Sequence, residues 1–103
     1  MYLTVFRNRK RPDMDLAAYQ ADNARMEELA RSQPGFISIK GFIAEDGEVV
    51  AISEWDSEEA ARAWGSHPEH AQVQARGRSD YYQTYKLYSC PEVRMRSYEH
   101  QSF

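Results

Sequence analysis

Residues 33–57, with the sequence QPGFISIKGFIAEDGEVVAISEWDS, contain the signals that decide the fold. Pro34-Gly35 is typical of a helix end, and it predicts that a strand follows at about residues 36–44. Asp46-Gly47 is the strongest short hairpin signal in the chain, so a second strand is expected at about residues 48–55. The stretch therefore predicts an antiparallel hairpin that directly follows a helix.

The residues before this hairpin predict one strand and one helix. Residues 2–10 alternate between two faces with the period of a strand. Asp13 or Asp15 can cap a helix that continues to about Arg31. The apolar residues of this segment recur about every 3.6 residues, which predicts that the buried face of the helix consists of Leu16, Tyr19, Met26, Leu29 and Ala30.

The residues after the hairpin predict a helical region and a last strand. Ser57 is a typical N-cap residue, Pro68 fits the first position of a further helical turn, and Gly77 is expected to end that turn. Residues 81–90 alternate again and predict a strand. The resulting order, β-α-β-β-α-β, is that of a ferredoxin-like α+β fold, in which a four-stranded antiparallel sheet carries two helices on one face.

The second and third strands of this pattern are apolar on both faces. In the second strand, strict alternation puts Phe36 and Phe42 on one side of the sheet and Ile37, Ile39 and Ile43 on the other. A sheet with one face in water alternates between apolar and polar side chains instead. Because two helices can cover only one face, we expect the other face to pack against a second copy of the chain in a two-fold homodimer.

The composition is that of a small globular domain. The chain has 103 residues, a formal net charge of −3 and 42% hydrophobic residues, which excludes a disordered chain. The modest acidity argues against nucleic-acid binding, and no apolar stretch is long enough for a membrane span. Cys90 is the only cysteine, which excludes an internal disulfide framework. Residues 1–6 lack the features of a signal peptide, so a cytoplasmic location is expected.

The C-terminal part holds four closely spaced tyrosines and a tail. Strict alternation places Tyr82 and Tyr88 on one face of the last strand and Tyr81 and Tyr85 on the other. One pair is expected to line a pocket and the other to lie in the dimer contact, and Tyr82 is favoured for the pocket. One domain is expected over residues 1–91, and residues 92–103 form a tail that is either disordered or reaches the partner subunit.

Four short segments form a recognisable set, namely FRNR at 6–9, QPGF at 33–36, EWDSEEA at 54–60 and AWGSHPEH at 63–70. Together they resemble the antibiotic biosynthesis monooxygenase family over roughly residues 2–90. The resemblance implies a dimeric α+β barrel, in which the sheets of two subunits face one another and each subunit has a pocket between its sheet and its helices. It also implies that some members oxidise aromatic polyketides or quinols with O2 and use no metal, flavin or haem.

The candidate catalytic residues are Trp64, His70 and Asn8. Trp64 is expected to form an aromatic wall against a planar substrate, and His70 to act as the base that deprotonates a phenol. Asn8 shares a strand face with Phe6 and would hold a substrate carbonyl or an oxygen species. The structural alternatives are that Trp64 belongs to the core, that the histidines satisfy helix ends and that Asn8 is exposed at a fraying strand end.

Four further residues are expected to bind the substrate: Tyr82, Phe6, His67 and Gln74. In the haem-degrading branch of the family the resemblance implies a ligating histidine near the position of Gln74, and glutamine is a poor haem ligand. Pro68 interrupts the helix between His67 and His70, so no native metal site is expected. The basic run over residues 7–11 is expected to be a solvated strand end.

Three functions agree with these patterns. The first is a cofactor-independent monooxygenase that oxidises a small aromatic or quinol substrate, because the chain has no flavin or nicotinamide fingerprint and no phosphate loop. The second is a non-catalytic dimer that binds a small hydrophobic ligand, which the same absence fits equally well. The third is a haem-binding or haem-degrading protein.

Overall fold

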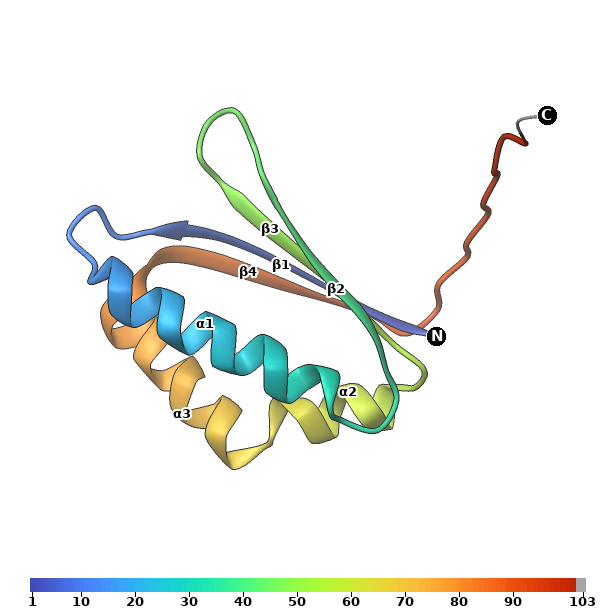
Figure 1. Ribbon diagram of the computed structural model, residues 1–103, viewed down its shortest axis with the longest axis horizontal. Helices are drawn as coiled ribbons and strands as arrows, with labels where there is room; N and C mark the ends of the chain where they lie inside the picture. The colour runs from blue at the N-terminus through green and yellow to red at the C-terminus, as the bar shows by residue number, and fades with distance from the viewer. Residues whose placement is uncertain (102–103) are drawn as a thin grey trace.

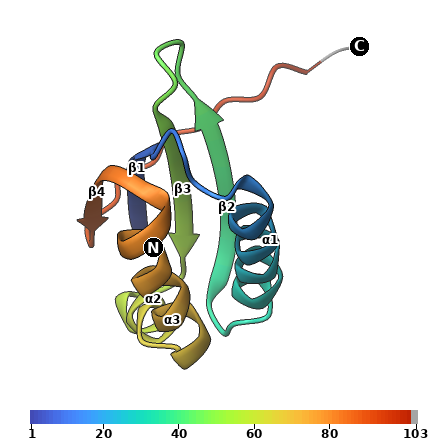
Figure 2. The same cartoon turned by 90° about the vertical axis from the view of Figure 1, so that its left-hand side faces the viewer.

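Four antiparallel strands form one sheet in the order β2-β3-β1-β4, and the helices lie against one of its faces (Figures 1 and 2). The computed structural model describes residues 1–101. The elements are β1 (Tyr2–Lys10), α1 (Leu16–Arg31), β2 (Phe36–Ile43), β3 (Val49–Trp55), α2 (Glu58–Gly65), α3 (Pro68–Arg76), the π-helical turn η1 (Gly77–Tyr81) and β4 (Tyr82–Cys90). The predicted ferredoxin-like α+β fold is confirmed, with α2 and α3 together in the place of its second helix.

The helices begin at the residues that the sequence predicts. The Asp15 side chain accepts a hydrogen bond from the Ala18 N–H at 3.0 Å, and the Ser57 hydroxyl accepts one from the Ala60 N–H at 3.1 Å. Gly77 ends α3, but the chain then continues through the π-helical turn before β4 begins. Each cap satisfies an N–H that has no partner within its own helix.

The prediction that Leu16 is buried is wrong, because its side chain is 56% exposed. Met26 and Ala30 are the buried residues of α1. Leu16 is the first residue of α1, whereas both buried residues lie in the second half of the helix, so its place at the helix end leaves it exposed.

A β-bulge in β2 corrects the predicted faces of that strand. The register between β2 and β3 shifts between Phe36 and Ser38, so that Ile37 is an extra residue. As a result, Phe36 shares the helix-covered face with Ile39 and packs edge-on against the Trp55 ring, with 5.5 Å between ring centroids. Phe42 lies on the opposite face, which reverses the grouping that strict alternation predicted.

A second bulge lies in β4. The register between β1 and β4 shifts between Arg9 and Lys10, which pair with Thr84 and Tyr82 and leave Gln83 as the extra residue. Tyr82 and Tyr85 therefore share the helix-covered face, contrary to the predicted alternation. Tyr81 does not belong to the strand and is buried in η1.

The core lies between the sheet and the helices. Trp55 is its most deeply buried large side chain, at 2% exposure. The Asp22 carboxylate of α1 accepts two hydrogen bonds from the Arg76 guanidinium, at 2.8 and 2.9 Å, and one from the Tyr81 hydroxyl at 2.6 Å. These bonds join α1 to α3 and η1 and so fix the helix layer over the sheet.

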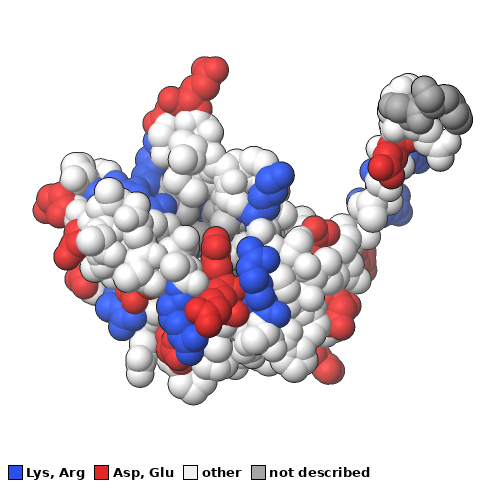
Figure 3. All heavy atoms as spheres, viewed as in Figure 1, with Lys and Arg blue, Asp and Glu red and all other residues white. Residues whose placement is uncertain are grey.

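The opposite face of the sheet is left open by the helices. It carries several apolar side chains, of which Phe42 and Tyr88 are 47% and 44% exposed. On the helix side, Figure 3 shows basic and acidic side chains interspersed over the helices and an acidic tip on the β2–β3 hairpin. Within residues 1–101 no helix is both long enough and apolar enough to cross a membrane.

Candidate active site

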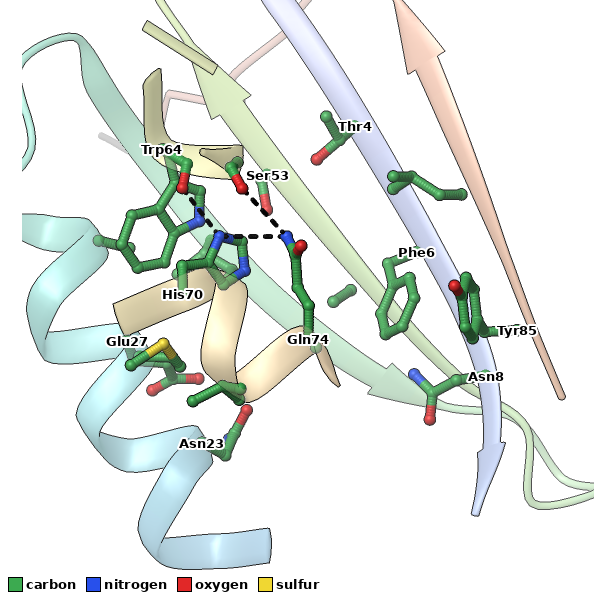
Figure 4. Close-up of a pocket in the computed structure, with 18 of the residues that line it drawn as sticks. Thr4, Phe6, Asn8, Asn23, Glu27, Ser53, Trp64, His70, Gln74 and Tyr85 are labelled. Atoms are coloured by element: carbon green, nitrogen blue, oxygen red, sulfur yellow. Dashed lines mark hydrogen bonds between the residues drawn. The ribbon is translucent and has the colours of Figure 1, made fainter. Parts of the chain in front are cut away.

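A cavity of about 540 Å³ lies between the helix-covered face of the sheet and the helix layer. Its sheet wall is built by alternate residues of β1 and β3 and by the residues that the bulge of β4 turns inward. Its helix wall comes from α1, α2, α3 and η1. Figure 4 shows the two walls facing one another, with Trp64, His70 and Gln74 on the helix side and Phe6, Asn8 and Tyr85 on the sheet side.

Trp64 and His70 form a stacked pair in the helix wall. Their ring centroids are 4.1 Å apart with an interplanar angle of 12°. Pro68 interrupts the helix here, because it stands where the fourth residue after Trp64 would donate a helical N–H, and proline has none. The carbonyl oxygen of Trp64 accepts from the His67 N–H at 3.1 Å and also from the His70 ring, whose Nδ1 lies 2.9 Å away (Figure 4).

This contact determines which of the two ring nitrogens of His70 carries the proton. A carbonyl oxygen only accepts hydrogen bonds, so Nδ1 carries the proton and Nε2 keeps its lone pair. Burial lowers the pKa of His70 below its ordinary value and outweighs the hydrogen bond to the Trp64 carbonyl, which raises it, while the nearby His67 acts in the same direction as burial. His70 is thus held as a neutral imidazole with one free acceptor nitrogen, which is the form that takes up a proton.

Gln74 lies one helical turn after His70 and also lines the cavity. Its amide nitrogen is 3.4 Å from Nδ1 of His70 and 3.5 Å from the carbonyl oxygen of Gly65. Because Nδ1 donates to the Trp64 carbonyl, the Gln74 amide donates to Gly65 rather than to the imidazole. Gln74 therefore braces the corner between α2 and α3 and presents its side chain to the cavity beside His70.

His67 is placed differently from the other predicted site residues. It is the N-cap of α3, where its Nδ1 accepts a hydrogen bond from the Glu69 N–H at 3.2 Å. Its ring lies 5.8 Å from the Trp64 ring, centroid to centroid, and it does not line the cavity. The structure thus brings His70, Trp64 and Gln74 together and leaves His67 outside the cavity lining.

The sheet wall brings together Asn8, Phe6 and Tyr82. Asn8 is only 3% exposed and lines the cavity, so it is not at a fraying strand end. The Phe6 ring is 5.3 Å from the Tyr82 ring and 5.4 Å from the Tyr85 ring, centroid to centroid. Burial raises the pKa of Tyr82, which keeps its hydroxyl protonated and able to donate a hydrogen bond.

Sequence reasoning missed Tyr85, which lines this wall, and Lys10, which lies beside the cavity against Asn8. Strict alternation predicts Tyr85 on the other face, because a bulge cannot be seen in an alternation pattern. The basic run predicts a solvated strand end for Lys10, but Lys10 is half-buried and its ammonium donates to the Asn8 side-chain oxygen. The signal for Lys10 was present, since the period of two places it on the face of Asn8.

Within residues 1–101 no three His, Cys, Asp or Glu side chains are grouped closely enough to hold a metal ion.

Comparison with known proteins gives one curated relative, the uncharacterized protein YqjZ of Bacillus subtilis. The two are 38% identical over 63 residues, which are 61% of this chain and 55% of YqjZ. The chain thus spans about half the length of the curated relative that it matches.

Two solved structures share the fold. Rv0793 from Mycobacterium tuberculosis is 20% identical, with a TM-score of 0.79 over 93% of this chain and 98% of that chain. A variant of SnoaB from Streptomyces nogalater, described as a cofactor-independent oxygenase, is 20% identical, with a TM-score of 0.74 over 91% of this chain and 94% of that chain. The sequence model of the antibiotic biosynthesis monooxygenase family matches residues 1–76, which is well over half of the chain. With this match and the agreement in fold, the chain belongs to the antibiotic biosynthesis monooxygenase family.

Proposed function

We propose that this protein is a cofactor-independent monooxygenase that oxidises a small planar aromatic or quinol with O2, and that it acts as a homodimer in the cytoplasm. The observation that carries the proposal is the His70 imidazole, which is held neutral inside the cavity with Nε2 free to accept a proton. The description of SnoaB, which shares the fold, as a cofactor-independent oxygenase supports the same reaction class.

The proposed reaction begins with proton removal. An anthrone or hydroquinone that lies in the cavity gives a proton to Nε2 of His70 and becomes an electron-rich carbanion or phenolate. For an anthrone, the carbanion transfers one electron to O2, and the resulting radical pair joins to form a carbon–oxygen bond. The peroxide takes a proton back from His70 and loses water, so that a CH2 group and O2 become a C=O group and H2O. The substrate thus supplies all the electrons.

The remaining cavity residues orient this reaction. The stacked Trp64 and His70 rings together form an aromatic part of the helix wall for a planar substrate, and Phe6 lies in the facing wall. The Asn8 amide and the Tyr82 hydroxyl are the donors that would hold the oxygen atoms of the substrate or of the peroxide. Gln74 keeps the α2–α3 corner in place beside the base.

The test is O2 uptake by the purified, metal-stripped protein with a panel of anthrones and hydroquinones, corrected for the autoxidation of each compound. We expect uptake that falls by about 100-fold or more in His70→Ala, since a general base contributes on that order. Trp64→Phe is expected to raise KM more than it lowers kcat. His100→Ala removes a histidine that lies outside the cavity lining and is the matched control.

A second function is supported by the aromatic lining itself. Trp64, Phe6, Tyr82 and Tyr85 could hold a planar ligand without any acid–base step. A pure binding protein would consume no O2 with any compound of the panel, and its affinity would not change as His70 titrates. Uptake that is lost in His70→Ala and kept in His100→Ala excludes this alternative.

A further inference from the structure

Lys10 is a half-buried cation for which the described residues offer no carboxylate partner. It is the last residue of β1, and its side chain lies on the helix-covered face of the sheet. Its ammonium lies 4.7 Å from the centroid of the Tyr19 ring and 5.4 Å from that of the Tyr82 ring. All ion pairs between side chains within residues 1–101 are made by arginines. Lys10 therefore places an uncompensated positive charge beside the cavity.

The one polar side-chain contact of Lys10 in the described chain is with Asn8. The ammonium donates a hydrogen bond to the Asn8 side-chain oxygen, which fixes the orientation of the amide. The Asn8 nitrogen then points away from Lys10, toward the cavity, as Figure 4 shows. No fully buried side-chain nitrogen or oxygen in residues 1–101 lacks a partner, and no described acceptor binds this nitrogen, so it is open to the cavity.

This arrangement makes Asn8 a stronger donor than an isolated amide. A cation that donates to the amide oxygen draws electron density from the nitrogen, and hydrogen bonds in such a chain strengthen one another. The surroundings are largely aromatic, where the effective dielectric constant is low and a charge acts over a longer distance. Burial also lowers the pKa of Lys10, as expected for an ammonium that an anion has yet to compensate.

We propose that Lys10 is a positioning residue that fixes and polarises the Asn8 amide for an anionic oxygen, so that the cavity selects aromatic substrates that carry an ionisable oxygen. This inference rests on the proposed function and deepens it. His70 lies in the helix wall and Asn8 in the facing sheet wall. A phenol or an enolisable ketone would lose its proton to His70, and the negative charge would settle on the oxygen that Asn8 binds. The substrate class is thus a phenolate or an enolate, rather than a neutral hydrocarbon.

The experiment measures the pKa of a bound phenol by absorption spectroscopy, with 4-nitro-1-naphthol as the probe because its anion absorbs visible light. Wild-type protein is expected to lower the pKa of the bound probe by about one unit, which is about tenfold in favour of the anion. Lys10→Met should abolish most of this lowering of the pKa of the probe. Lys10→Arg keeps the positive charge and should retain most of it. Asn8→Asp, which can accept from Lys10 but cannot donate, should move the pKa of the bound probe upward.

Lys86→Met is the matched control, because Lys86 is exposed on the opposite face of the sheet and its removal changes the net charge by the same amount. Asp22, Glu27, Arg62 and Arg78 also reach the cavity lining and remain in every variant, as do Tyr19, Tyr82 and His70. A difference between Lys10→Met and Lys86→Met therefore reports on the cation at the position of Lys10 and not on the net charge of the protein. Circular dichroism checks that each variant is folded.

The outcomes separate this inference from the proposed oxygenase. An unshifted pKa of the probe in wild type, the same shift in Lys10→Met, or no binding of the probe would overturn the role of Lys10. If O2 uptake then continues unchanged in Lys10→Met, the proposed oxygenase activity holds and only the role of Lys10 is wrong. A shifted pKa that depends on Lys10, without O2 uptake by any compound, would keep the anion site and remove the oxygenase.

Discussion

At the scale of single residues, the chemistry of the cavity depends on how the two nitrogens of His70 are used. Nδ1 donates to the Trp64 carbonyl, whose oxygen also accepts from the His67 N–H but receives no helical hydrogen bond from Pro68. Nε2 is thereby left as the acceptor. The segment Trp64–His70 thus fixes the tautomer of His70, with the proton on Nδ1. In the same segment His67 caps α3 and His70 faces the cavity.

The neutral state of His70 predicts a pH dependence of stability. Its pKa is lowered in the fold from an ordinary value of 6.5, so the unfolded chain binds more protons between the two values. The free energy of unfolding therefore falls as the pH drops below about 6.5, and the loss is complete once the pH lies below the folded pKa. His70→Gln cannot titrate and lacks this loss. Thermal unfolding followed by circular dichroism from about pH 7.5 to about pH 5 compares the two.

His100→Gln is the control for this comparison, because His100 is exposed and should follow the wild-type curve. The other titrating groups are common to all three proteins and cancel in the differences. Parallel curves for wild type and His70→Gln over the whole range would contradict a buried neutral imidazole. They would also weaken the assignment of His70 as the base.

At the scale of the elements, the connection between α1 and β2 depends on Gly35. Its φ of +83° lies in the left-handed region, and a Cβ built there would come within 2.4 Å of an Asp56 carboxylate oxygen and 2.5 Å of the Ala60 Cβ. Since β2 begins at Phe36, this glycine sets where the strand enters the sheet and how closely α2 approaches it.

Gly35→Ala is expected to lower the free energy of unfolding by about 3 kcal/mol or more, because strain and overlap add. Gly47 provides a matched control, since its φ is +89° but nothing lies within 4 Å of its Cβ position. Gly47→Ala should lower the free energy of unfolding by only about 1 kcal/mol. Urea unfolding measures both. Equal losses would show that the close approach at Gly35 does not matter.

The order of the elements could be predicted from the sequence because each boundary carries its own local signal. Pro34-Gly35, Asp46-Gly47 and Ser57 act within a few residues of their place in the chain, and the structure has the element boundaries where they predict them. The two bulges could not be predicted in this way. They depend on how β2 registers against β3 and β4 against β1, which are contacts between residues far apart in the sequence.

The difference between local signals and long-range contacts also explains which cavity residues could be predicted from the sequence. Trp64, His70 and Gln74 lie close together in the sequence: His70 and Gln74 are one turn apart on α3, and the break between α2 and α3 brings Trp64 against them. Tyr85 depends on the bulge at Gln83, so strict alternation put it on the wrong face. Lys10 belongs to a basic run whose other members point outward or bind backbone groups, and only the packing of Tyr19 and Tyr82 around it reveals its place.

At the scale of the whole molecule, the helices cover one face of the sheet and leave the other open (Figure 2). Residues 91–101 lead away from this body rather than folding over it (Figure 1), and residues 102 and 103 of the predicted tail lie outside the described part. The open face combines apolar side chains at its centre with paired charges, such as Arg7 with Glu48 at 2.8 Å, toward the hairpin end. Its apolar residues are Leu3, Val5, Phe42, Val50, Ile52 and Tyr88.

This face predicts a homodimer in solution. Val5 pairs with Ile52 across the two central strands, so a charge at Val5 falls in the middle of the face. If two copies pack these faces together, Val5→Glu buries an unpaired carboxylate in the contact and separates the subunits, because that burial costs several kcal/mol. The isolated subunit should stay folded, since the substituted side chain lies outside the core between sheet and helices. Sedimentation velocity should give twice the chain mass for wild type and the single chain mass for Val5→Glu.

Leu16→Glu is the control, because Leu16 is also apolar but lies 56% exposed on α1, away from the open face. It should sediment with wild type. A wild-type protein that sediments as a single chain at tens of micromolar would refute the dimer, and a dimeric Val5→Glu would place the contact elsewhere. If the dimer is confirmed, wild type should melt at higher temperature as its concentration rises, whereas the melting of Val5→Glu should not depend on concentration.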